Sequence, residues 1–205
     1  MGELIDYMEA YDMLNKYHIK SVESRYVKNA DEAIKFSDGD AIVLKVLSQK
    51  ALHKSKSGLV ELNLATAESI SDAFGRLERK AQQLRPYNIL AQKMVSGGLE
   101  IIVGGNTDPQ FGKLILIGLG GIYVETFKDF ALRVCPISRY DAESMLSQLK
   151  SSKIIASDGK AKRQIIELLV NASRMFTGSN ISELDLNPVI LHDGTYDAVD
   201  LRLIR

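Results

Sequence analysis

A short apolar run that ends in glycines limits the folds open to this chain. The run is Lys113-Leu-Ile-Leu-Ile-Gly-Leu119, and Gly120 and Gly121 follow it directly. Its shortness, its branched apolar residues and its glycine stop are typical of a strand buried on both faces. Because glycine has no Cβ, such a turn lets backbone N–H groups approach an anion closely. The pattern predicts a strand and a tight turn, and the turn is either purely structural or part of a phosphate-binding loop.

Strand and helix patterns alternate along the rest of the 205 residues. Helices are expected over roughly the first 18 residues and over 29–36, 66–84, 140–151 and 160–177, with Asn29 or Asp31 and then Thr66 as N-caps. Strands are expected over 22–27, 41–46, 59–64, 88–95, 99–103, 181–191 and 196–204. No Pro-rich linker or internal repeat interrupts the pattern. The interleaving predicts an α/β or α+β protein with mixed sheets.

The charge balance excludes bulk attraction to nucleic acid or to an anionic membrane. Lysine and arginine number 26, aspartate and glutamate number 26, and the formal net charge is +0, so any anion site must be local. The longest apolar run falls well short of the ~20 residues that span a bilayer. Glu3 and Asp6 stand where a signal peptide carries basic residues, so we expect a soluble, cytoplasmic protein. The single cysteine, Cys135, excludes an internal disulfide, and we expect it to pack in a strand.

Two segments in the first half of the chain carry basic residues that are candidates for phosphate binding. Lys45 lies within an apolar strand, where its ammonium must reach solvent or a paired anion. It is either a lysine at a strand edge or end, or a lysine directed at a phosphate. The loop from His53 to Gly58 reads as a solvated loop or as one that cradles phosphates, and an imidazole can accept and release a phosphoryl group near neutral pH.

The last two predicted strands carry oxygen ligands. Glu183, Asp185 and Asn187 alternate along one strand, so their side chains share a face. Asp200 is expected on the next strand, across a hairpin at His192-Asp193-Gly194. Such ligands suit Mg²⁺, which binds through one or two carboxylates plus substrate phosphates. A charged solvent face is the alternative, because the apolar residues between them supply a buried opposite face.

A weaker pattern joins two of the predicted strands. Gln92-Lys-Met-Val95 leads through two glycines to Glu100. The backbone of such a connection can pair with an adenine edge, and a nearby carboxylate can accept hydrogen bonds from ribose hydroxyls.

Together these segments resemble the nucleotide-binding β subunit of the ADP-forming acetyl-CoA synthetases, also called NDP-forming acyl-CoA synthetases. That family is a branch of the ATP-grasp superfamily and is related to succinyl-CoA synthetase. The matching segments run in order along nearly the whole chain, at 14–19, 43–45, 53–55, 92–95, 100–104, 108–112, 118–136, 181–188 and 198–200. The resemblance implies a single ATP-grasp domain over 1–205. Its smaller lobe would span about 21–94, its larger lobe about 95–205 with the opening helix 1–20, and the nucleotide would lie between them.

The resemblance also implies roles for individual residues. Lys45 would contact the ATP phosphates, Gln92 to Val95 would form the adenine hinge, and Glu100 would hold the ribose. Asn187 and Asp200 would sit at the Mg²⁺ site, with Asp185 close by. The residues expected to bind the nucleotide are Lys45, Lys54, Gly58, Gln92, Lys93, Met94, Val95, Glu100, Gly120, Gly121 and Glu125.

The implied activity is the reversible conversion of acyl-CoA, ADP and phosphate into a free acid, CoA and ATP. This chain would perform the nucleotide half, with His53 taking a phosphoryl group from a phosphohistidine of a partner α subunit and passing it to ADP. The α subunit would supply CoA binding and acyl-phosphate formation, which implies a hetero-oligomer.

Three residues depart from the family pattern. Lys56 stands where an acidic residue is usual, Leu59 replaces a second glycine, and His18 replaces a glycine after the opening helix. The first two bear on the shape of the phosphate loop and on nucleotide preference. Two alternatives stay open: within enzymes, a succinyl-CoA-synthetase-like β subunit, and from another class a non-catalytic nucleotide-sensing subunit, which is suggested by Lys56 and Leu59. Retention of His53 argues against the sensor, because a sensor needs no phosphoryl acceptor.

Overall fold

The computed structural model describes residues 2–50, 58–121 and 129–205. It divides the chain into two compact units. One comprises Met1–Ser21 together with Ser96–Arg205, and the other comprises Val22–Val95. We call them the larger and the smaller unit. Among the described residues, no helix is both long enough and apolar enough to cross a membrane.

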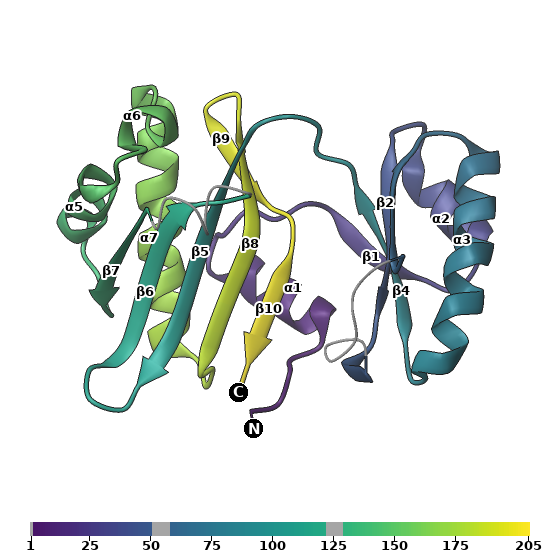
Figure 1. The fold of residues 1–205 in the computed structure, drawn as a ribbon, viewed down its shortest axis with the longest axis horizontal. Helices are drawn as coiled ribbons and strands as arrows, with labels where there is room; N and C mark the ends of the chain where they lie inside the picture. Colours follow the sequence, from purple (N-terminus) through teal and green to yellow (C-terminus); the bar gives the residue numbers. More distant parts are fainter. Residues whose placement is uncertain (1, 51–57, 122–128) are drawn as a thin grey trace. The chain divides into compact units, whose positions relative to one another are not determined.

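The smaller unit is an antiparallel sheet with helices on one face (Figure 1). Its strands, in the sheet order β1-β4-β2-β3, are β1 (Ser24–Val27), β4 (Asn88–Lys93), β2 (Ile42–Leu47) and β3 (Val60–Leu64). Its helices are α2 (Ala30–Ser37), α3 (Ala67–Ala81) and the short 3-10 helix η2 (Gln82–Leu84). Alternate strand residues such as Leu44 and Ala91 pack with α3 residues such as Leu77 in one buried cluster. The hydrophobic cluster therefore lies between the helices and one face of the sheet.

Local capping explains where the two helices of this unit begin. The Asn29 side chain accepts a hydrogen bond from the backbone N–H of Glu32 at the start of α2. Thr66 and Ser69 cap each other's backbone N–H groups at the start of α3. Each cap satisfies donors that the first turn of a helix leaves without a partner. The structure thus confirms Thr66 and selects Asn29 over Asp31.

The larger unit is a second antiparallel sheet, in the order β10-β8-β5-β6-β7 with β9 also paired to β8. Its strands are β5 (Leu99–Asp108), β6 (Gly112–Leu119), β7 (Phe130–Val134), β8 (Glu183–His192), β9 (Thr195–Ala198) and β10 (Leu201–Ile204). Its helices are α1 (Tyr7–Lys16), α5 (Arg139–Gln148), α6 (Ser152–Ile155) and α7 (Gly159–Gly178). Helices α1, α5 and α7 lie on one face of the sheet (Figure 1). We call the other face its open face.

Glycine allows the sheet and α7 to approach closely. A Cβ built on Gly105 would lie 2.9 Å from the Leu114 carbonyl oxygen and 3.0 Å from the Phe176 ring. Any larger residue would push α7 away from the sheet. Strand β5 runs through this glycine to Asp108, well beyond the predicted end at Val103, and it stays paired with β6 over that length.

Three expectations about strands were wrong in detail. All pairings between named strands are antiparallel, so the sheets are not mixed; hairpins join β5 to β6 and β8 to β9. Strand β6 is buried on one face only, because helices cover one side: Ile115 is fully buried, whereas Leu116 is half-buried. The last predicted strand is split into β9 and β10, and Asp200 lies in the gap between them.

Candidate functional site

The first group of predicted site residues lies in the smaller unit, where Lys45 occupies an interior strand. It is directly opposite Leu90 of β4 on one side and Val60 of β3 on the other. Its exposed fraction is 9%, and its neighbour Leu44 packs in the helix-covered cluster. Because side chains alternate along a strand, Lys45 points to the face that the helices leave uncovered. An edge or strand-end position is therefore excluded, and a role for Lys45 at a phosphate stays a prediction.

Gln92 shares this face of the sheet with Lys45. It is fully buried, and its Nε2 donates a 2.9 Å hydrogen bond to the Ser24 hydroxyl. Register places Gln92 opposite Val43, two residues from Lys45 on the neighbouring strand. The hydrogen bond to Ser24 holds the Gln92 side chain in place. Lys45 and Gln92 therefore lie on the same face of the sheet, on neighbouring strands.

The Lys93 side chain points the opposite way. Its Nζ donates to the Ser37 carbonyl oxygen at 2.7 Å and to the Asp40 carboxylate at 2.9 Å. It also lies 5.6 Å from the centre of the Phe36 ring. The Lys93 ammonium is therefore engaged at the end of α2 and is not grouped with Lys45. The next residue, Met94, donates its backbone N–H to the Ala41 carbonyl oxygen at 3.0 Å.

Three of the predicted residues, His53, Lys54 and Glu125, lie outside the described residues. The last residue of the predicted phosphate loop, Gly58, has a φ of +81°, which favours glycine. Its carbonyl oxygen accepts a 2.9 Å hydrogen bond from Lys80 Nζ on α3. This contact fixes the point at which the chain enters β3. Val95 is half-buried and is the last residue of the smaller unit.

A second group lies in the larger unit, where Glu100 and the glycine turn are in direct contact. The backbone N–H of Gly120 donates a 2.7 Å hydrogen bond to the Glu100 carbonyl oxygen. A Cβ on Gly120 would lie 2.9 Å from that same carbonyl group, and Gly121 has a φ of +66°. Close backbone packing therefore accounts for Gly120 without any ligand. The Glu100 side chain is exposed beside this turn.

Two of the predicted metal ligands, Asn187 and Asp200, are backbone neighbours at the point where β8 changes its partner strand. Asp185 and Asn187 alternate on the open face, while Leu184 and Leu186 are buried on the other face. Opposite Asn187, the chain passes from β9 to β10, and the Asn187 N–H donates a 3.2 Å hydrogen bond to the Asp200 carbonyl oxygen.

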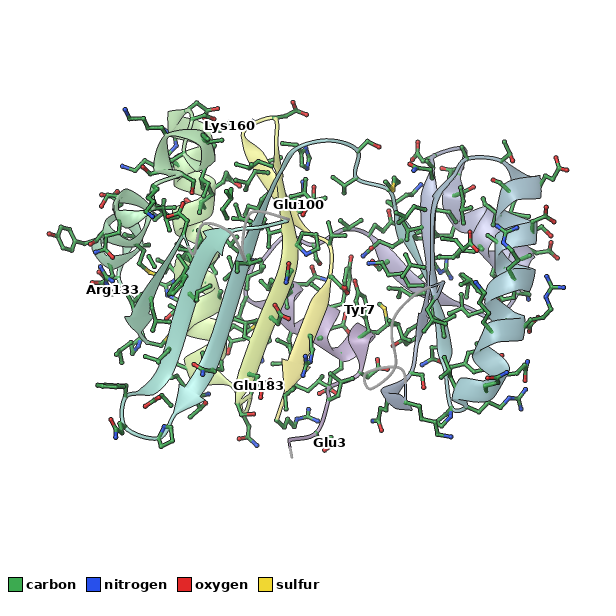
Figure 2. All side chains as sticks on the ribbon, viewed as in Figure 1. Glu3, Tyr7, Glu100, Arg133, Lys160 and Glu183 are labelled. Atoms are coloured by element: carbon green, nitrogen blue, oxygen red, sulfur yellow. The ribbon has the colours of Figure 1, made fainter. Side chains whose placement is uncertain are left out.

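Glu100 and the predicted metal ligands occupy different positions along the strands of the larger sheet. Figure 2 labels Glu100 and Glu183 toward opposite ends of the sheet, as the antiparallel pairing of β5 with β8 requires. Asn187 lies between these two ends along β8. Among the described residues, no group of three or more His, Cys, Asp or Glu side chains is arranged to hold a metal. Two carboxylates and one amide leave coordination positions for water and substrate oxygens, which is the arrangement that Mg²⁺ prefers.

One polar cluster was not predicted from the sequence. The buried Asp197 carboxylate accepts from Lys20 Nζ at 3.2 Å and lies 2.7 Å from His192 Nε2. The Tyr196 hydroxyl accepts from the Lys20 N–H at 3.2 Å, and burial raises the pKa of Tyr196. This cluster ties the β8–β9 hairpin to the segment that follows α1. The pairing joins residues more than 170 positions apart in the chain, which no local pattern could predict.

Asp129, at the start of the described part after the glycine segment, is a second buried acid. Its carboxylate accepts the backbone N–H groups of Lys150 and Ser151, both at 2.8 Å. Burial acts to raise the pKa of Asp129, but these hydrogen bonds outweigh it and hold the pKa below its usual value. Asp129 therefore anchors the connection between α5 and α6. Cys135 was expected to pack in a strand, but it lies just after the end of β7 and is half-buried. Burial raises the pKa of its thiol.

Two antiparallel sheets, each covered by helices on one face, and the polar residues on their uncovered faces define the class of this protein. The ATP-grasp domain family matches residues 2–204. The chain belongs to that family.

Within the family, the chain is similar to subunits of ADP-forming ligases. It is 34% identical to the β subunit of acetate–CoA ligase (ADP-forming) I from Pyrococcus furiosus, over 96% of this chain and 89% of that protein. It is 35% identical to acetate–CoA ligase (ADP-forming) I from Archaeoglobus fulgidus, over 96% of this chain but only 30% of that longer protein.

A solved structure shares the same fold. It is the dinucleotide-forming acetyl-coenzyme A synthetase 1 of Ca. Korarchaeum cryptofilum, in complex with coenzyme A and Mg-AMPPCP, with its phosphohistidine segment pointing towards the nucleotide binding site. The TM-score is 0.81 and the identity 34%, over 98% of this chain and 92% of that chain.

Proposed function

We propose that this chain is the nucleotide-binding β subunit of an ADP-forming acyl-CoA synthetase. The observation that carries the proposal is the end-to-end match to the Pyrococcus furiosus β subunit, at 34% identity over 96% of this chain and 89% of that one. A similarity confined to the fold would leave the activity open. Similarity along both chains supports the same division of labour.

The smaller unit contributes the contacts to the base and the phosphates. Lys45 and Gln92 lie on neighbouring strands and on the same uncovered face of the sheet. A lysine ammonium held in a largely buried setting binds a phosphate more strongly than one in bulk water does, because local screening is weaker. Gln92 begins the segment whose backbone receives the adenine edge, and Glu100 of the larger unit receives the ribose hydroxyls.

The larger unit contributes the metal ligands. The backbones of Asn187 and Asp200 are hydrogen-bonded to each other, and Asp185 shares the open face two residues along β8, which supports these three residues as the ligands. The donor set of two carboxylates and an amide oxygen fits Mg²⁺. When bound, Mg²⁺ neutralises charge on the transferring phosphoryl group. Asn187, Asp200 and Asp185 would hold the ion through their side-chain oxygen atoms.

His53 is the phosphoryl acceptor of this proposal, although it lies outside the described residues. A ring nitrogen of His53 forms a bond to phosphorus as the phosphohistidine of the partner subunit releases its own nitrogen. An oxygen of the ADP β-phosphate then attacks the same phosphorus, and His53 leaves, which yields ATP. Both steps conserve the phosphoryl group and require no oxidant or reductant.

A partner subunit completes the enzyme. The Archaeoglobus fulgidus relative is a longer protein of which this chain covers 30%, and such a length accommodates further domains in the same polypeptide. Here those domains would belong to an α subunit that binds CoA and forms the acyl phosphate. The functional protein is then a hetero-oligomer.

The test is reconstitution of the reaction from separate subunits. This chain is mixed with the α subunit of an ADP-forming acetate–CoA ligase, together with acetyl-CoA, phosphate and Mg-ADP, and ATP formation is recorded. ATP formation that requires both subunits supports the proposal. If the chain binds Mg-ADP but produces no ATP with any α subunit to which it binds, the catalytic assignment is wrong and a sensing role gains support.

A further inference from the structure

A groove in the smaller unit lies away from all the proposed nucleotide contacts. It has a volume of about 620 Å³ and is formed where β1 ends, where β4 begins and along the second half of α3. This volume is within the range of pockets that hold small organic molecules. All of its lining residues belong to the smaller unit.

The floor of the groove is apolar and already ordered. Val27, Phe74 and Ile89 line it, each is at most 6% exposed, and all three belong to the cluster that packs between the helices and the sheet. Tyr87 forms part of the wall, and its hydroxyl accepts a 3.3 Å hydrogen bond from Gln82 Nε2. An apolar group that entered would meet a preformed surface and would cost little reorganisation.

The rim of the groove carries an excess of positive charge. Lys28 and Arg85 line it together with a single acid, Glu78. Within residues 2–50, 58–121 and 129–205, neither the Lys28 ammonium nor the Arg85 guanidinium has an ion pair or a side-chain hydrogen bond. The Glu32 carboxylate, four residues along the chain, accepts a 2.9 Å hydrogen bond from the Lys28 backbone N–H instead. Two cations above an apolar floor suit an anionic group on an apolar body.

The groove is distinct from the nucleotide site by its place on the sheet. Ile89 points toward the helices, whereas Lys45 and Gln92 point to the uncovered face. The groove also lies at the start of β4, while the hinge segment begins near its end, about 13 Å away along the strand at about 3.3 Å per residue. A ligand in the groove would not compete directly with the proposed nucleotide contacts.

We propose that this groove binds a small organic anion, with one phosphate or carboxylate group held by Lys28 and Arg85 and an apolar body resting on Phe74 and Ile89. The proposal concerns a second site and does not depend on the catalytic function. Lys28 and Arg85 would bind the charged group of the ligand, and the buried residues of the floor would contact its apolar part. Glu78 would act against tight binding because it faces the same anion.

The experiment titrates the full chain, labelled with ¹⁵N, and follows the backbone amides. Phenyl phosphate and phenylacetate are the two probes, and inorganic phosphate alone reports on charge without an apolar body. We expect saturable shifts at Lys28, Tyr87 and Ile89 below about 10 mM for one or both organic probes, and clearly weaker binding of inorganic phosphate. The phosphate and carboxylate probes identify the anion.

Variants then separate this site from general charge attraction. Lys28→Gln and Arg85→Gln should each weaken binding about threefold to tenfold, and Glu78→Gln should strengthen it about twofold. The matched control is Arg79→Gln, an exposed arginine on α3 that does not line the groove, and it should change nothing. Equal weakening by Arg79→Gln, equal binding of inorganic phosphate, or shifts confined to other residues would each overturn the proposal.

Discussion

The backbone N–H of Asn187 donates a hydrogen bond to the carbonyl oxygen of Asp200 at 3.2 Å. This contact crosses the gap at which one partner strand of β8 ends and the next begins. Because the backbones meet there, two oxygen-bearing side chains from separate segments stand next to each other. The proposed metal ligands Asn187 and Asp200 are therefore opposite each other, because the pairing register of β8 with β9 continues into its pairing with β10.

Replacing Asp200 with asparagine should chiefly remove the metal dependence of nucleotide binding. The amide keeps the size of the side chain but loses the charge that attracts Mg²⁺. Calorimetric titration of ADP, with and without Mg²⁺, measures the effect. We expect the gain in affinity caused by Mg²⁺ to fall by about tenfold or more.

The control for Asp200→Asn is Glu183→Gln, which removes a carboxylate from the same face of β8 at its far end. Glu183 lies 3.9 Å from Arg202 with both side chains about half exposed, so the pair adds little stability. If Glu183→Gln and Asp200→Asn reduce the Mg²⁺ effect equally, the metal site is misassigned.

Lys45→Met should weaken Mg-ADP binding by about 1.5–3 kcal/mol, roughly one to two decades in Kd. Methionine preserves the aliphatic body within the sheet and removes only the ammonium, so the fold should be retained. Lys35→Met, on the exposed side of α2, is the matched control and should bind as the natural protein does. Unchanged affinity for Lys45→Met, with an unaltered circular dichroism spectrum, would contradict the phosphate role.

Much of the fold follows from local sequence signals. The apolar periodicity and the caps at Asn29 and Thr66 locate α2 and α3, and the Asp193-Gly194 turn locates the β8–β9 hairpin. Both turn residues have positive φ angles, of 48° and 69°, as a two-residue hairpin requires. Whether the strands pair parallel or antiparallel could not be predicted from local signals, because it depends on partners that are far apart in the sequence.

Candidate site residues can be identified from the sequence where a residue type conflicts with its surroundings. Lys45 stands out because an ammonium in an apolar strand needs an explanation, and the structure places it on an interior strand. Gly120 shows the limit of the approach. The same glycine is expected from a phosphate loop or from close packing, and only the 2.9 Å approach to Glu100 reveals the packing contribution.

Gly120→Ala should therefore destabilise the protein, by about 1–3 kcal/mol, because its Cβ would overlap the Glu100 backbone. Gly75→Ala is the matched control, and it should stabilise the protein. A Cβ at Gly75 meets nothing within 4 Å, and alanine favours the interior of α3 by about 0.5–1 kcal/mol. Urea unfolding of both variants measures the difference. A Gly120→Ala protein as stable as the natural one would show that the turn can relax.

Asp129→Asn should lower the free energy of unfolding at neutral pH by about 1–3 kcal/mol, because two backbone N–H groups lose a charged acceptor. The pKa of Asp129 is lowered in the folded state, so its stabilising effect is complete above the unfolded pKa of about 3.9 and is lost as the pH falls through the folded pKa. The difference between the two proteins should therefore shrink below about pH 4. A difference that is constant from pH 7 to pH 3 would point to packing rather than charge.

His53→Ala should abolish phosphoryl transfer while leaving Mg-ADP affinity nearly unchanged. A carrier acts in the reaction and contributes little to the binding of the ground state. With the α subunit, acetyl-CoA and radiolabelled phosphate, the natural chain should acquire a phosphate that is labile in acid and stable in base, and ADP should discharge it as ATP.

The two other histidines serve as controls for that experiment. His192 lies 2.7 Å from the Asp197 carboxylate, and His18 follows the C-terminal end of α1 with a φ of 57°. The variants His192→Gln and His18→Asn should therefore both acquire the radiolabelled phosphate as the natural chain does. Full turnover by His53→Ala would reject the carrier mechanism. Label that persists in His53→Ala but disappears from one of the other two variants would keep the mechanism and move the phosphoryl group to that histidine.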